Sequence, residues 1–157
     1  PIYNEYYELG LQRMNRTLKT YKADEEQLET LKSKNFNGKI LIITEPWCGD
    51  ASATVPAVSK FFEGHNEVRI FYRDSDTSLI DQFLTNGTQS IPKILILNED
   101  FSLKNVWGPR PQYGTELLKK FKENPETYPR EEFYNDLQVY YAKNKGKDAI
   151  QEILELL

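Results

Sequence analysis

Four short apolar runs along the chain are bounded by glycine, proline or polar turn residues, a pattern typical of β-strands. The run at 39–44 is β-branched and leucine-rich, as expected for a strand buried on both faces. In the run at 68–72, Val68, Ile70 and Tyr72 alternate with other residues. We therefore predict strands at 39–44, 68–72, 93–97 and 103–107.

Other apolar positions recur at steps of three and four, which predicts helices. The first such stripe must be buried against another element, and it contains Tyr3, Tyr7, Leu11, Met14, Leu18 and Tyr21. Asp24 followed by Gln27 indicates the start of a second short helix. Five more helical segments are predicted: at 50–62 with a bend at Pro56, around 79–84, around 117–121, and, beyond Pro129, two that include 133–141 and 150–157.

The central elements follow the order βαβαββα, which implies an α/β fold with a mixed sheet and helices on both faces. We divide the chain into an N-terminal helical extension at 1–36, a core domain at 37–124 and a C-terminal helical extension at 125–157. Both extensions are expected to pack on the core.

Charge and composition exclude several classes of function. A net charge of -4 without a long basic run gives no surface for nucleic acid or an anionic membrane. No apolar run is long enough to cross a bilayer. No cluster has metal-ligand spacing, so we expect no metal and no cofactor. Cys48 is the one cysteine, which rules out an internal disulfide and fits a reducing compartment, so we predict the cytoplasm.

Cys48 lies in the sequence Trp47-Cys48-Gly49-Asp50-Ala51, between a predicted strand and a predicted helix that contains Pro56. Ser90-Ile91-Pro92 precedes an apolar strand, and Gly108 follows Pro92 by sixteen residues. Together these features resemble the thioredoxin-like superfamily over roughly residues 37 to 124. With the turn Trp107-Gly108-Pro109-Arg110-Pro111, the loop is more narrowly similar to a bacterial branch with a single cysteine.

The resemblance implies a thioredoxin-like fold, an active-site loop at Cys48 and a cis peptide bond before Pro92. It also shows two departures. Ala51 stands where dithiol thioredoxins have their second cysteine, so the two-cysteine cycle is excluded. Ile42 stands where thioredoxins bury an acid that assists proton transfer.

The residues around Cys48 act on its thiol in opposite directions. The start of a helix favours thiolate, whereas the carboxylate of Asp50 disfavours it, and the net sign stays open from sequence. Arg110 lies on the same face in the resembling fold, where a guanidinium would favour thiolate or hold an anionic substrate. We predict that Cys48 is accessible and catalytic, and that the binding residues are Trp47, Gly49, Asp50, Ile91, Pro92 and Arg110.

Two functions from different classes remain open. The first is monothiol exchange, in which Cys48 attacks a protein disulfide or receives a low-molecular-weight thiol and an external thiol releases it. The second is a binding module that uses the groove beside Pro92 without turnover. A monothiol glutaredoxin with an iron–sulfur cluster is disfavoured, because Cys48-Gly49-Asp50-Ala51 replaces that family's Cys-Gly-Phe-Ser. The sequence leaves the oligomeric state open.

Overall fold

The computed structural model describes residues 2–157, with side chains from residue 5 onward except that of Tyr6. Its sheet has the strand order β2-β1-β3-β4. The strands run at the predicted residues, β1 (Lys39–Thr44), β2 (Val68–Tyr72), β3 (Lys93–Leu97) and β4 (Leu103–Trp107). β1 pairs with β2 in parallel and with β3 in antiparallel orientation, and β3 and β4 are antiparallel. The sheet is therefore mixed, as the element order predicts.

The two central strands carry the sheet's contribution to the core. Ile40, Ile42 and Ile43 of β1 and Ile94 and Ile96 of β3 are at most 1% exposed. Burial of such side chains is the main force that holds the layers together. The edge strands β2 and β4 are more exposed, since each is covered by fewer neighbouring elements.

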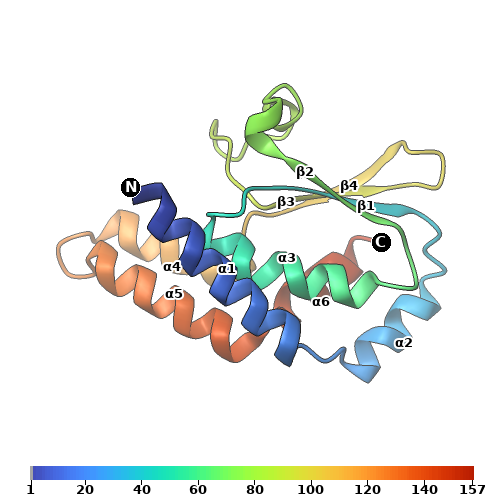
Figure 1. Ribbon diagram of the computed structural model, residues 1–157, viewed down its shortest axis with the longest axis horizontal. Coiled ribbons are helices and arrows are strands. Elements are labelled where there is room, and N and C mark those ends of the chain that lie inside the picture. The colour runs from blue at the N-terminus through green and yellow to red at the C-terminus, as the bar shows by residue number, and fades with distance from the viewer. Residues whose placement is uncertain (1) are drawn as a thin grey trace.

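Helices pack mainly on one side of the sheet (Figure 1). In the described residues they are α1 (Ile2–Thr20), α2 (Glu25–Ser33), α3 (Gly49–Phe62), α4 (Gln112–Glu123), α5 (Arg130–Asn144) and α6 (Lys147–Glu155). Asp24 caps α2 by accepting the backbone N–H of Gln27, as its sequence predicts. α3 continues through Pro56.

The prediction of a helix around residues 79–84 is wrong. The structure has two 3₁₀ turns in the connection from β2 to β3, η1 (Arg73–Ser75) and η2 (Ile80–Gln82). One turn is enough to bury Ile80 completely, whereas Leu84 stays 45% exposed. The chain then reverses through Asn86 and Gly87, both with positive φ, which leaves no room for a longer helix. This connection lies on the face of the sheet opposite the α-helices (Figure 1).

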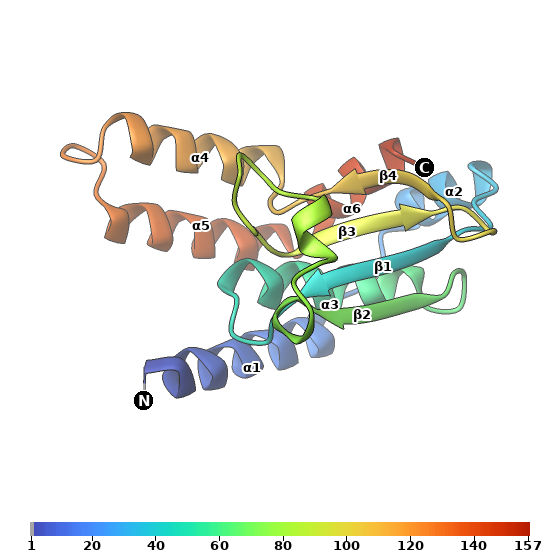
Figure 2. The ribbon, with the colours of Figure 1, turned by 90° about the horizontal axis from the view of Figure 1, so that it is seen from above.

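Only part of the apolar stripe predicted for the first helix lies on the face that α1 buries, since Met14 and Tyr21 are half-buried and Tyr21 packs against the core. Tyr7, Leu11 and Leu18 are at least 39% exposed, and the side chain of Tyr3 lies outside the described residues. The buried position is Gly10, where an added Cβ would lie 2.5 Å from the carbonyl oxygen of Pro46. Close backbone approach therefore orients α1, and this approach brings α1 alongside α3 (Figure 2).

The two C-terminal helices pack in different places. α6 joins the main core through Ile150, Ile153 and Leu154, and its Glu152 accepts the indole N–H of Trp107 at 2.9 Å. α5 pairs with α4 over a second cluster of Tyr128, Phe133, Leu137 and Tyr141. α5 also reaches α3, which brings it close to Cys48. Within residues 2–157 no helix combines the length and apolarity needed to cross a membrane.

Candidate functional site

Cys48 is the N-cap residue of α3, where the chain leaves the end of β1 and turns into the helix. Its backbone is extended, with φ -76° and ψ 124°. The thiol donates a hydrogen bond to the backbone carbonyl of Ile91, with an Sγ···O distance of 3.5 Å. The residues predicted to form the loop and the proline turn are therefore adjacent in space.

The sulfur is buried, contrary to the expected accessible thiol. Cys48 is 8% exposed, and burial is the largest cause that raises its pKa to about 11, followed by the carboxylate of Asp50. The backbone N–H groups of Ala51 and Asp50, and then Arg110, act in the opposite direction but do not compensate. The neutral thiol is thus the form that this environment favours at neutral pH.

Arg110 and Asp50 meet next to Cys48. Two parallel contacts of 3.1 Å join them, from the guanidinium Nε to Asp50 Oδ1 and from Nη2 to Oδ2. The hydroxyl of Tyr141 donates to the same Oδ1 at 2.5 Å. Arg110 is therefore paired with a carboxylate. From the sequence we expect its charge to favour a thiolate or hold an anionic substrate, but most of that charge is balanced by Asp50. Tyr141 was predicted only as part of an apolar helix face.

The pKa of Tyr141 lies well above its usual value. The largest cause is burial, followed by the negative charge of Asp50 and by the hydrogen bond that the tyrosine donates to Asp50. Its hydroxyl remains a donor at physiological pH and locks α5 to the start of α3. This contact joins residues that are 91 positions apart in sequence.

The proline loop is closed rather than open as a groove. The Ile91–Pro92 peptide bond is cis, and both residues are buried. The carbonyl of Ile91 already accepts the Cys48 thiol, so an extended peptide would have to share this carbonyl with the thiol or displace it. The Gly108–Pro109 bond is also cis, which the sequence did not predict.

An open cleft lies on the other side of Cys48, between the loop, α1 and α5. Its volume is about 490 Å³. The loop contributes Trp47, Cys48, Gly49 and Asp50, and the other lining residues are Leu9, Gly10, Arg13, Arg110, Tyr134, Leu137 and Gln138. Ile91 and Pro92 are not among them. The contributions of α1 and α5 were missed; an isolated glycine within a helical pattern, Gly10, is the one sequence signal that could have indicated close packing.

A family model described as thioredoxin matches residues 2–122. The chain belongs to the thioredoxin family. The match begins within α1, so it extends beyond the region 37–124 on which the sequence resemblance rests. Two of the helices that surround the core, α1 and α2, are thus covered by the thioredoxin family model.

Solved structures share this thioredoxin-like fold. A crystal structure of a protein of unknown function from Pseudomonas aeruginosa is 20% identical, with a TM-score of 0.66, covering 96% of this chain and 82% of that chain. The crystal structure of an HIV epitope scaffold is 18% identical, with a TM-score of 0.67 and coverages of 96% and 83%. At these identities the likeness concerns the fold alone. No curated protein matches the chain.

The raised pKa of Cys48 in this thioredoxin-family chain predicts a pH-dependent loss of stability. The folded state keeps the thiol proton up to about pH 11, whereas the unfolded chain loses it near its usual value of 9. The contribution is full below pH 9 and is lost as the pH rises from 9 to 11, by about 2–3 kcal/mol. The measurement is the free energy of unfolding by denaturant of the parent and of Cys48→Ala from pH 8 to 11. The tyrosines titrate in both proteins, so the difference between the two isolates the contribution of the thiol. A constant difference in free energy of unfolding would contradict the prediction.

The described residues do not form a metal-binding site. Among the described residues of the thioredoxin-family chain, no three histidine, cysteine, aspartate or glutamate side chains are placed to hold one ion.

Proposed function

We propose that this thioredoxin-family chain is a binding protein whose partner occupies the cleft beside Cys48, with Cys48 as a neutral thiol in its wall. The observation that carries the proposal is the burial of Sγ together with its hydrogen bond to the carbonyl of Ile91. A thiol can donate that bond and a thiolate cannot, so the contact supports the protonated form. The sequence leads us to expect binding in the groove beside Pro92. We place the binding site in the cleft between α1 and α5 instead.

The walls of the cleft indicate what would bind. Leu9 is 41% and Tyr134 is 55% exposed, and with Trp47 they present apolar and aromatic surface. Arg13 and Gln138 offer hydrogen-bond donors at the same opening. Pockets with apolar walls and a few polar groups are typical of ligand sites. An apolar side chain of a protein partner, or the apolar part of a small thiol compound, suits this combination.

Alkylation of Cys48 by iodoacetamide, followed by intact mass against pH, tests the proposal. We expect slow reaction at pH 7–8 and a rate that rises with a midpoint near pH 11. The chain unfolded in denaturant should react as fast as free cysteine, and Cys48→Ser should not react. A folded-state midpoint at or below about 8.5 would overturn the binding proposal in favour of chemistry.

Monothiol exchange is the second candidate, favoured by the position of Cys48 at the N-cap of α3. The backbone N–H groups of Asp50 and Ala51 lower the thiol pKa there, although burial outweighs them. In this reaction the Cys48 thiolate attacks a disulfide, forms a mixed disulfide and releases one thiolate. A low-molecular-weight thiol then attacks the mixed disulfide and frees Cys48, since Ala51 cannot.

Incubation of the folded chain with oxidised 2-mercaptoethanol at pH 7.5 separates the two candidates. Monothiol exchange requires an adduct of one equivalent that is absent in Cys48→Ser and reversed by added thiol. The binding proposal expects no adduct on the time scale on which the unfolded chain is fully modified.

We also propose that the chain belongs to a bacterial branch of the family with the loop Trp47-Cys48-Gly49-Asp50-Ala51. The loop and the turn at Gly108 support this branch. A single free cysteine supports a reducing compartment such as the cytoplasm.

A further inference from the structure

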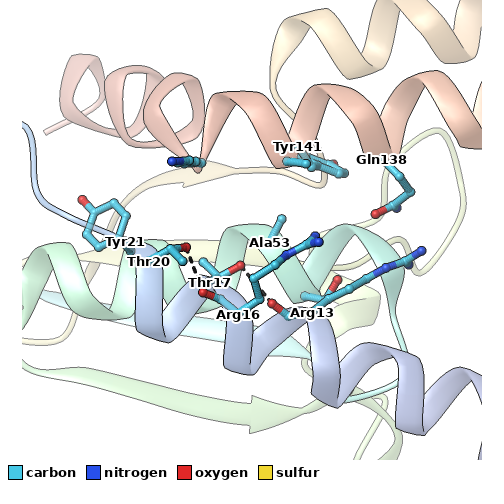
Figure 3. A pocket seen from close by; sticks show the side chains of 11 residues that line it. Arg13, Arg16, Thr17, Thr20, Tyr21, Ala53, Gln138 and Tyr141 are labelled. Atoms are coloured by element: carbon cyan, nitrogen blue, oxygen red, sulfur yellow. Dashed lines mark hydrogen bonds between the residues drawn. The ribbon is translucent and has the colours of Figure 1, made fainter.

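A second pocket borders the Cys48 cleft and lies between α1, α3 and α5 (Figure 3). Its cations are Arg13 and Arg16 of α1 and Lys145 at the C-cap of α5. No acidic side chain lines it. Within the described part of the chain, none of these three cations forms an ion pair with a carboxylate. The pocket is therefore a concentration of positive charge without a counter-charge from the protein.

The two arginines are close enough to repel each other. Burial first, and then the charge of Arg16, lower the pKa of Arg13. Figure 3 shows both side chains extending from α1 toward the side of α5 that carries Tyr141 and Gln138. Arg13 is half-buried whereas Arg16 and Lys145 are exposed, so solvent screens part of this repulsion, and an anion bound beside the cations would relieve the rest.

The remaining groups limit the kind of anion. The hydroxyls of Thr17, Thr20 and Ser52 donate to backbone carbonyls of their own helices. The donors left for a ligand are the guanidiniums, the ammonium, the amide of Gln138 and the hydroxyl of Tyr21, which is buried and has no hydrogen-bond partner among the described residues. The volume is about 190 Å³. This is below the range of about 300–1,000 Å³ that drug-sized ligands occupy, which favours a small anion. Guanidiniums match the planar, multidentate geometry of phosphate and carboxylate oxygens.

We propose that the pocket formed by Arg13, Arg16 and Lys145 binds a phosphate group, either as inorganic phosphate or as the end of a small phosphate ester. A phosphate dianion would neutralise most of the three charges and accept hydrogen bonds from both arginines. Arg16 and Lys145 line this pocket and not the Cys48 cleft, whereas Arg13 and Gln138 line both. Substitution of Arg16 or Lys145 therefore tests the anion site without changing a residue that lines the cleft.

The experiment is calorimetric titration of the full chain with inorganic phosphate at constant ionic strength, with chloride as the reference anion. We expect saturable binding of one equivalent, weakened about tenfold or more in Arg16→Gln and in Lys145→Gln. Arg69→Gln removes the same charge from an exposed site on β2 and should leave the affinity unchanged. A parallel titration with glycerol 3-phosphate separates the sources: a phosphate-ester site binds it more tightly than inorganic phosphate, and a free-phosphate site binds it more weakly.

Two results would overturn the proposal. One is the absence of saturable binding of both probes. The other is equal weakening by Arg69→Gln and Arg16→Gln, which would mean that the anion responds to net charge rather than to this pocket. Because Cys48 alkylation takes no part in these measurements, their failure leaves the binding proposal for the cleft untouched.

Discussion

Replacing Asp50 with asparagine is expected to lower the pKa of Cys48 below its parent value of about 11 and to speed its alkylation at pH 8. The Asp50 carboxylate is the largest cause of the raised pKa after burial, and its removal also leaves Arg110 free to favour the thiolate. Asparagine keeps the size of the side chain, so burial of the sulfur should change little. The measurement is the pH dependence of alkylation in the folded state.

The same substitution should also destabilise the fold. Asp50 accepts from both Arg110 and Tyr141, and an asparagine oxygen cannot serve both partners as a charged group does. Breaking a buried ion pair costs about 3–5 kcal/mol, and we expect about 2–3 kcal/mol here because the Arg110 and Asp50 side chains keep 21% and 12% exposure. Denaturant unfolding at pH 7 measures the loss.

Asp136→Asn is the matched control. Asp136 also accepts a tyrosine hydroxyl, that of Tyr128 at 2.7 Å, but it is not among the groups that shift the thiol. This variant should lose stability without a change in the pKa of Cys48. If Asp50→Asn left the pKa of Cys48 as high as in the parent, burial alone would account for it.

The strands and the loop were predictable because their signals are local. The run at 39–44 needs only its composition and its flanking Gly38 and Pro46 to indicate a buried strand. The turn from that strand into a helix likewise places Cys48 at an N-cap without knowledge of distant residues. Adjacency of Cys48 and Pro92 came from the resemblance rather than from any local pattern.

The failures have a common cause, which is competition from tertiary contacts. The apolar residues between positions 79 and 84 have helical spacing. A single 3₁₀ turn is nevertheless enough to bury Ile80 completely, so no longer helix is needed. Apolar spacing also predicted only part of the buried face of α1: Met14 and Tyr21 are half-buried, but the close contact of Gly10 with Pro46 leaves Leu11 and Leu18 exposed. Periodicity shows where apolar surface lies and does not show how much of it a neighbour covers.

The environment of Cys48 could not be predicted for the same reason. Local residues supply the helix start and Asp50, which oppose each other, while the deciding contribution is burial. Tyr141 and Gln138 reach the loop from about ninety positions further along the chain. No pattern around residue 48 encodes the helices that surround it.

Gly10→Ala is expected to destabilise the protein, although alanine normally stabilises a helix by about 1 kcal/mol over glycine. The added Cβ would lie 2.5 Å from the carbonyl oxygen of Pro46, a backbone atom that cannot rotate away. α1 must therefore shift from the loop, at a cost of about 1–3 kcal/mol, as for other overpacked sites. Asn15→Ala, on an exposed position of the same helix, is the control and should be neutral or stabilising.

The same shift of α1 would open the cleft and expose Cys48, so Gly10→Ala should also raise the alkylation rate at pH 8. Equal stability changes in Gly10→Ala and Asn15→Ala would contradict the packing of α1 on Pro46. Gly10→Ala acts on burial, whereas Asp50→Asn acts on charge, so the two variants measure the two causes of the raised pKa separately. Because burial is the larger cause, we expect Gly10→Ala, which opens the cleft beside the sulfur, to lower the pKa of Cys48 further than Asp50→Asn does.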